Sequence, residues 1–159
     1  MSESILSAYP PLNLPAAALD IRRGVSGRRE VFDRWRNRWV ALTPEEWVRQ
    51  HFVSMLVSEK GYISGRIANE ISISLNGMSR RCDTVIYDSA MHPVMIVEYK
   101  APTVQLSQHA FDQIARYAMV LRTPLLAVSN GMCHYCCRMD YENGACVFLK
   151  DVPCYDSIV

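Results

Sequence analysis

The chain has 159 residues, of which 50% are hydrophobic, so it can bury one sizeable core and we expect a single compact unit. Its formal net charge is only +1, which excludes a global field that draws it toward nucleic acid or a membrane. There is no run of 18 or more apolar residues, and the N-terminus lacks the basic-then-apolar layout of a signal peptide, so we expect a cytoplasmic protein.

The first 40 residues differ from the rest. Residues 1–20 contain three prolines and no clear hydrophobic period, which predicts an extended arm or a short strand with a linker. Residues 22–38, RRGVSGRREVFDRWRNR, hold seven of the 17 Lys and Arg residues against two acids. This segment could be a solvated linker or a phosphate-contacting arm, with Trp35 and Trp39 among its arginines. We therefore separate an N-terminal extension, 1–40, from a domain, 41–159.

Two amphipathic helices are predicted. The first begins at TPEEWVRQHF, where Thr43 is a good N-cap, Pro44 suits the first helical position and Glu46 would complete a capping box. Its apolar face comprises Val48, Phe52, Met55 and Leu56, and Gly61 ends it. The second helix covers SQHAFDQIARYAMVL and ends before Thr123-Pro124. Its apolar face comprises Phe111, Ile114, Ala118 and Leu121.

The remaining periodic segments predict strands. ISISL alternates like a half-buried strand and is followed by an Asn76-Gly77 turn. RRCDTVIYD and PVMIVEYK predict two more strands, and PLLAVSNG, an apolar run that ends in a turn, predicts a central one. MCHYCCRMDYENGACVFL predicts a C-terminal β-hairpin around residues 142–144. The order is helix, three antiparallel strands, helix, strand and hairpin, which predicts an α/β fold with a mixed central sheet.

Four of the six cysteines fall within residues 133–146. Cys133 and Cys136 form one C-x-x-C motif, but a zinc site usually needs a second ligand pair, and none is clear here. We therefore favour ordinary strand chemistry, in which Cys136 and Cys137 lie on opposite sides of a strand and one of them is buried as a small hydrophobe.

Three charges accompany the strands of residues 83–100, DTVIYDSAMHPVMIVEYK. If Asp83 lies opposite Glu98, alternation places both carboxylates and the Lys100 ammonium on one sheet face. The same register pairs Val85 with Ile96 and Tyr87 with Val94.

Two opposed carboxylates repel each other, and partial burial would raise their pKa values, so this arrangement costs stability unless a cation lies between them. Mg²⁺ suits such a site because it is commonly held by one or two carboxylates together with water and phosphate. The alternative is that Asp83 and Glu98 lie at strand ends and pair with Arg80, Arg81 or Lys100.

The surrounding sequence resembles a known family. It is similar to the PD-(D/E)XK nuclease superfamily, and most closely to the nuclease domain at the N-terminus of type I restriction enzyme restriction subunits. The matching pieces span residues 43–131 in the family's order: TPEEWVRQHFVSMLVSEKGY, IANEISISLNG, RRCDTVIYD, MIVEYKAP, FDQIARY and LLAVSNG. The resemblance implies a restriction-endonuclease-like fold and metal-dependent hydrolysis of DNA phosphodiester bonds.

Carried over by position, the resemblance implies that Asp83 and Glu98 hold Mg²⁺ or Mn²⁺ and that Lys100 assists the attacking water. Gln113 and Tyr117 match a Q-x-x-x-Y element; because they are four residues apart, they share one helical face, which could also be routine helix surface.

The resemblance also matches Glu46 to an acid of the first helix that binds the metal directly or through water. The competing role for Glu46 is the cap with Thr43. Glu70, at the head of the first strand, is the other candidate for the third acid.

The relatives continue into motor domains and work beside other restriction subunits, so the resemblance implies DNA and such subunits as partners. The 159 residues contain no G-x-x-x-x-G-K-[ST] motif, so we expect no ATP-driven translocation by them. Two alternatives stay open. The chain could be a non-catalytic DNA-binding or assembly module whose affinity comes from residues 22–38, or a homodimer in which the N-terminal arm swaps onto a neighbour.

Overall fold

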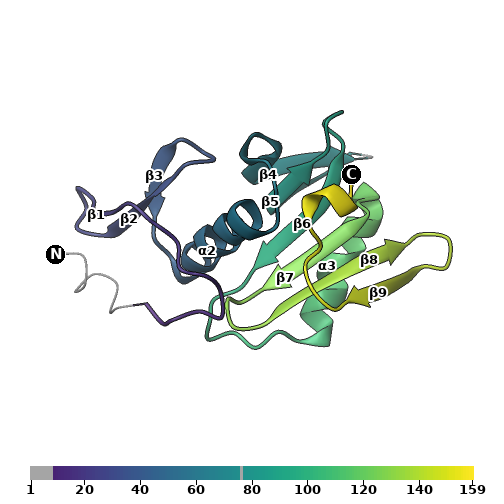
Figure 1. Ribbon diagram of the computed structural model, residues 1–159. Coiled ribbons are helices and arrows are strands. Elements are labelled where there is room, and N and C mark those ends of the chain that lie inside the picture. The colour runs from purple at the N-terminus through teal and green to yellow at the C-terminus, as the bar shows by residue number, and fades with distance from the viewer. Residues whose placement is uncertain (1–8, 76) are drawn as a thin grey trace.

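The computed structural model of the chain describes residues 9–75 and 77–159. Its main body is a six-stranded sheet with the order β4-β5-β6-β7-β8-β9, and a separate three-stranded sheet, β1-β2-β3, lies at one side (Figure 1). Helix α2 packs on one face of the large sheet and helix α3 on the other. In the part of the chain that the structure describes, no helix is long and apolar enough to cross a membrane.

The large sheet is mixed. Its first three strands are antiparallel, namely β4 (Ile67–Leu75), β5 (Met78–Tyr87) and β6 (Pro93–Tyr99). Strand β7 (Leu125–Ser129) then pairs with β6 in parallel, which requires a crossover that α3 provides. Strands β8 (His134–Asp140) and β9 (Ala145–Leu149) complete the sheet in antiparallel pairing. The prediction of an α/β fold with a mixed sheet is therefore confirmed.

The hairpin of β5 and β6 has almost the expected register. Val85 faces Ile96 as predicted. Tyr87, however, pairs with Pro93 and not with Val94, because an irregularity between Ile86 and Tyr87 shifts the register by one residue. The predicted turn at Asn76-Gly77 lies partly outside the described residues, since these omit Asn76; Gly77 has the positive φ of 76° that such a turn requires.

Helix α2 (Pro44–Glu59) is buried on nearly all sides. Its predicted apolar face packs against the large sheet, with Phe52 and Leu56 fully buried. On another side, Trp47 packs with Val31 and Leu42 of the small-sheet region. Because protein covers the helix from two directions, polar residues of its first turns are buried as well, which amphipathic periodicity does not predict. These residues are Glu46, Arg49, Gln50 and His51.

The start of α2 differs from the predicted capping box. Thr43 Oγ1 accepts a hydrogen bond from the Glu46 backbone N–H at 3.1 Å, as expected for an N-cap. The Glu46 carboxylate does not complete the box, because it accepts hydrogen bonds from Arg36 and Gln50. At the other end, the Tyr62 backbone N–H bonds to the Leu56 carbonyl around Gly61, which has a φ of 74°, as predicted.

The Arg-rich segment is not a solvated linker. It forms β1 (Ile21–Arg23), β2 (Arg29–Asp33) and β3 (Arg38–Ala41), so the boundary predicted at residue 40 falls inside a strand. Ile21 pairs with Val31, and Val31 with Val40. These apolar residues share one face, which packs toward Leu42 and Trp47; arginines at the intervening positions hide the alternation in the sequence.

Residues 9–20 follow an extended path without helix or strand, in keeping with the predicted arm. The Tyr9 ring stacks on Trp47 at a centroid distance of 5.0 Å, and its hydroxyl donates to the Leu42 carbonyl at 2.8 Å. The Asn13 backbone N–H donates to the Gly131 carbonyl at 2.8 Å. The arm is thus docked on its own chain, and the arm-swapped homodimer stays a prediction.

Helix α3 (Gln108–Leu121) has Ser107 as its N-cap, whose hydroxyl accepts from the Ala110 N–H at 3.1 Å, and Arg122 as its C-cap, with a φ of 53°. Its predicted face packs on Val85, Ile96 and Leu126. Two 3₁₀ turns complete the described elements, η1 (Ser64–Arg66) and η2 (Tyr155–Ser157).

Both faces of β8 are covered, so Cys136 and Cys137 are both buried, on the α2 and α3 sides respectively. The prediction that only one of them is buried is wrong. All six cysteines are free thiols.

Replacing Gly131 by alanine tests how closely the arm packs. Its φ is 82°, and a Cβ there would lie 2.7 Å from Leu12 Cδ2 and 3.1 Å from Val48 Cγ2. We expect Gly131→Ala to lower the free energy of unfolding, measured by urea denaturation, by about 3 kcal/mol. Gly144→Ala is the matched control, because its φ is also positive, 63°, but nothing lies within 4 Å of a Cβ there. It should cost about 1 kcal/mol. Equal losses for the two variants would contradict this close packing.

Candidate active site

A cleft of about 640 Å³ lies between β3, the first turns of α2 and the neighbouring parts of β4, β5 and β6. It is lined mainly by charged side chains. The acidic ones are Glu45, Glu46, Glu70, Asp83 and Glu98, and the basic ones are Arg36, Arg38, Arg49 and Lys100. The cleft therefore brings together five residues from separate segments that the sequence analysis proposed as site residues: Asp83, Glu98, Lys100, Glu46 and Glu70.

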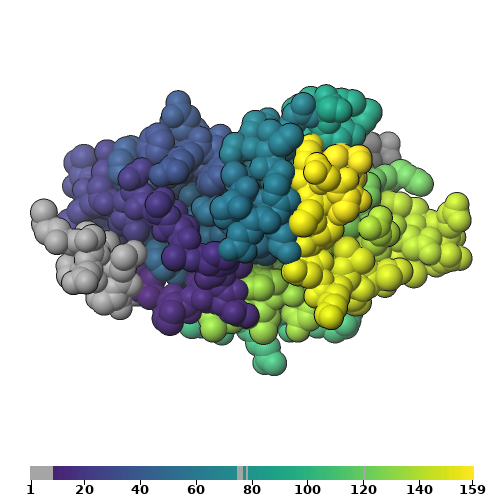
Figure 2. All heavy atoms as spheres, in the orientation of Figure 1, coloured from purple at the N-terminus to yellow at the C-terminus, as the bar shows by residue number. Residues whose placement is uncertain are grey.

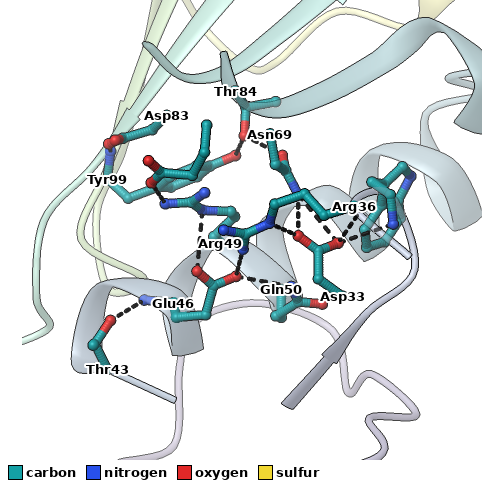
Figure 3. A network of polar contacts seen from close by, with 12 residues as sticks. Asp33, Arg36, Thr43, Glu46, Arg49, Gln50, Asn69, Asp83, Thr84 and Tyr99 are labelled. Carbon is teal, nitrogen blue, oxygen red and sulfur yellow. Dashed lines mark hydrogen bonds and ion pairs between the residues drawn. The ribbon is translucent and has the colours of Figure 1, made fainter. Parts of the chain in front are cut away.

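The position of Asp83 follows from the way β5 and β6 separate. Their backbone pairing extends to Thr84 and Val97. One residue further, Asp83 Oδ2 accepts a hydrogen bond from the Tyr99 backbone N–H at 2.9 Å (Figure 3). A side-chain acceptor thus satisfies a backbone donor of β6, and this holds the Asp83 carboxylate beside Glu98.

Glu98 is a buried acid that lies next to another acid. Its side chain is only 10% exposed. Burial, followed by the charge of Asp83 and a hydrogen bond with it, raises the pKa of Glu98 to about 8, although Arg80 acts in the opposite direction. Near neutral pH the two carboxylates therefore hold a proton that a cation in the same place would displace.

Arg80 and Tyr117 lie on the far side of Glu98. Arg80 Nη2 is 3.3 Å from Glu98 Oε1, and the Arg80 guanidinium carbon lies 3.3 Å from the centre of the Tyr117 ring. The ion pair with Arg80, considered as the alternative to a metal site, is thus present together with the contact to Asp83. Tyr117 reaches the site through Arg80, while Gln113 is exposed on the same helix and is outside the described lining of the cleft.

The two candidates for a third acid are already paired with arginines, and Figure 3 shows the contacts of one of them, Glu46. The Glu46 carboxylate accepts from Arg36 Nη2 at 2.6 Å and lies 3.7 Å from Arg49 Nε. The Glu70 carboxylate bridges Arg49 Nη2 and Arg81 Nε, each at 2.5 Å. Burial tends to raise the pKa of Glu70, but these arginines outweigh it and lower that pKa.

Glu70 is also held in an unusual backbone conformation. Its φ of 54° lies in the left-handed region, which residues other than glycine rarely adopt inside a strand. The bend falls beside Asp83 in the sheet, between the paired residues Asn69–Thr84 and Ile71–Cys82. The two ion pairs of its carboxylate help to maintain this strained geometry at the edge of the cleft.

A chain of buried hydrogen bonds connects the cleft to the small sheet. The Tyr99 hydroxyl donates to Thr84 Oγ1 at 2.9 Å, Thr84 donates to Asn69 Oδ1 at 2.8 Å, and Asn69 Nδ2 donates to Asp33 Oδ2 at 3.2 Å. Arg36 pairs with Asp33. Burial tends to raise the pKa of Asp33, but its hydrogen bonds and the charge of Arg36 together outweigh this effect, so that pKa is lowered overall.

These connecting residues were missed from the sequence. The available signal was weak: Asn69 and Thr84 are polar positions in otherwise apolar strands, and they pair across β4 and β5. Nothing in the Arg-rich segment marked Asp33 and Arg36 as partners of the first helix, because their proximity depends on the turn between β2 and β3.

The donor set at Asp83 and Glu98 fits a hard divalent cation. Two carboxylate groups lie in contact there, and Mg²⁺ is typically held by one or two carboxylates plus water and phosphate. Within residues 9–75 and 77–159, no three His, Cys, Asp or Glu side chains converge as a metal-binding group. A site built on the pair alone would thus leave most of the coordination positions to water and substrate.

Comparison with known proteins identifies the family. Residues 44–153 match the family of the type I restriction enzyme R protein N terminus, HSDR_N. The chain belongs to this family. The match begins at α2 and includes all six strands of the large sheet, so β1–β3 lie outside the matched HSDR_N region. The resemblance deduced from the sequence is confirmed.

A solved structure shares the fold. It is a fragment structure assigned to an HsdR subunit of a type I restriction enzyme from Vibrio vulnificus YJ016. It is 21% identical, with a TM-score of 0.53, and the match covers 74% of this chain. The match spans 24% of that solved chain, about a quarter of its length. A search among curated proteins gave no significant match.

The pKa of Glu98 predicts how stability changes with pH. Folding raises this pKa from its ordinary value near 4.5 to about 8, so the protonated form of Glu98 stabilises the folded state. This contribution to the free energy of unfolding is fully present below about pH 4.5 and is lost as the pH rises through about 8. In EDTA, the stability of Glu98→Gln relative to the wild type should therefore rise as the pH increases from about 5 to about 8. This rise should be on the order of 2 kcal/mol.

Thermal and urea unfolding at several pH values measure this rise. Glu142→Gln, which removes an exposed carboxylate from the β8–β9 turn, controls for the loss of one charge. A stability difference between Glu98→Gln and the wild type that stays constant with pH would contradict the assignment.

Proposed function

We propose that this protein hydrolyses phosphodiester bonds of DNA in a divalent-metal-dependent reaction of the restriction type. The observation that carries the proposal is the Asp83–Glu98 carboxylate pair in a cleft that also contains Lys100. Membership of the R protein N-terminal family supports a role in restriction-type defence. The chain spans about a quarter of the solved HsdR relative, so DNA and other restriction subunits as its partners are part of the proposal.

In this proposal, Asp83 and Glu98 hold Mg²⁺ or Mn²⁺, which supplies positive charge to the scissile phosphate when it is bound. The Tyr99 backbone N–H orients Asp83, and Arg80 orients Glu98. Lys100 places an ammonium in the same cleft, where it can contact the phosphate and the attacking water.

Glu46 can join the metal only if its carboxylate is released from Arg36 or Arg49, and the same holds for Glu70 with its arginines. Of the two α3 residues, Tyr117 contacts Arg80, which pairs with Glu98. Gln113 is exposed to solvent, and its proposed role is to contact the DNA backbone.

The alternative is a non-catalytic DNA-binding or assembly module on the same fold. One observation favours it: arginines already pair with Glu46 and Glu70, so these two acids of the cleft are electrostatically satisfied without a metal. The presence of Lys100 and the protonated carboxylate pair favours the catalytic proposal, because a purely structural ion-pair network has no need of two adjacent acids.

The direct test is cleavage of plasmid and linear DNA by the purified chain with Mg²⁺ or Mn²⁺, beside an EDTA control. Asp83→Asn removes a ligand charge, and Lys100→Ala removes the ammonium. Each is expected to lower the cleavage rate by about 100-fold or more. Lys150→Ala, which removes an exposed lysine just after β9, is the control and should cleave like the wild type.

Equal cleavage by wild type and Lys100→Ala would point to a contaminating nuclease and would contradict the catalytic role proposed for this site. If no form of DNA is cut with either metal, while DNA binding persists, the non-catalytic module is the better description.

A further inference from the structure

We infer that the β1–β3 sheet is a binding surface for the DNA phosphate backbone and forms one wall of the candidate active cleft. This inference rests on the proposed nuclease function, and it adds where the substrate's backbone is held. The sheet lies outside the residues that match the family, so the family match does not account for it.

The charge of the chain is concentrated in this sheet. Residues 21–41 contain seven arginines and two acids, a formal charge of +5, whereas the whole chain carries +1. All other residues together therefore carry −4. A polyanion gains little from the body of the protein and is attracted specifically to this segment.

The two acids of the sheet are both used internally. Glu30 pairs with Arg22 at 2.8 Å, and Asp33 pairs with Arg36. Arg28 and Arg38 are exposed, and neither makes an ion pair with any residue in the described part of the chain. Their guanidinium groups are thus available to an external anion.

The sheet is also continuous with the cleft. Arg36, Arg38, Val40 and Ala41 line the same cavity as Asp83, Glu98 and Lys100. If a phosphodiester lies at the carboxylate pair, the rest of its DNA strand must leave the cleft. On one side, the strand then passes the wall that contains Arg38. The acids of the cleft repel this backbone, and cations beside them compensate for the repulsion.

The arginines are held on a rigid element. The small sheet packs on α2 through Val31, Leu42 and Trp47, and the Arg22 guanidinium lies 4.1 Å above the Trp39 ring on its outer face. In the space-filling view, the residues coloured purple and dark blue gather at the left of the molecule (Figure 2). A preformed cationic surface loses less conformational freedom on binding than a flexible arm, which fits a role in positioning the backbone.

The test measures binding of the full chain to a short labelled DNA duplex by fluorescence anisotropy in EDTA, so that no cleavage occurs. The KCl concentration is varied from about 50 to about 200 mM. The test variant is Arg28→Gln/Arg38→Gln. The control is Arg138→Gln/Lys150→Gln, which removes the same charge from exposed positions at the β8–β9 end of the sheet. Thermal unfolding of each variant checks that it is folded.

We expect the test variant to bind about tenfold or more weakly than the wild type near 100 mM salt. Its slope of log affinity against log salt should be shallower by up to about 2, since each lost phosphate contact removes about 0.9. The control should bind like the wild type. Arg28→Lys/Arg38→Lys should retain most of the slope, because it keeps both charges.

Equal weakening by the test and control variants would overturn the inference, as would wild-type binding that does not depend on salt. The outcomes also separate this inference from the proposed function. If binding depends on the arginines but no metal-dependent cleavage occurs, only the nuclease proposal is overturned. If the wild type cleaves DNA and the test variant binds DNA as well as the wild type does, only the DNA-binding role of the β1–β3 sheet is overturned.

Discussion

The hydrogen bond from the Tyr99 backbone N–H to the Asp83 carboxylate is the contact on which the site depends. It is formed where β5 and β6 stop pairing, so the same contact satisfies a backbone donor of β6 and keeps the Asp83 carboxylate beside Glu98. Two acids in such contact are costly when both are charged, which appears as the raised pKa of Glu98. The sheet therefore contains a place that is destabilised without a proton or a cation.

The surroundings of this pair are arranged through buried polar groups. Tyr99, which orients Asp83 with its backbone, also extends its hydroxyl to Thr84 and onward through Asn69 to Asp33 of the small sheet. Arg36 and Arg49 each contact one oxygen of the Glu46 carboxylate (Figure 3). Truncating one member of such a network leaves other buried charges unpaired, so the cleft and the small sheet are expected to stay in one fixed relation.

The sequence predicted the parts whose signals are local. Thr43 and Gly61 mark the ends of the first helix, and placing Asp83 opposite Glu98 gave the observed pairing of Val85 with Ile96 in the central hairpin. The shift at Tyr87 was not predictable, because a bulge depends on how the loop of residues 88–92 closes.

The β1–β3 sheet was missed for a physical reason. Its apolar residues Ile21, Val31 and Val40 stand singly between charges, and their shared face exists only once the three strands pair. The same is true of Glu46. Local sequence favoured a cap, whereas the arrival of Arg36 from the turn between β2 and β3 draws the carboxylate away. Long-range charge pairing of this kind leaves no periodic trace in the sequence.

The central claim is that Asp83 and Glu98 together bind a divalent metal ion. Anomalous X-ray diffraction from crystals soaked in Mn²⁺ tests it most directly, because the ion locates itself in the map without reference to activity. We predict an anomalous peak between the two carboxylates, within coordination distance of both, and its loss in crystals of Asp83→Asn. Well-diffracting soaked crystals with no peak at this position, or with Mn²⁺ bound only elsewhere, would contradict it.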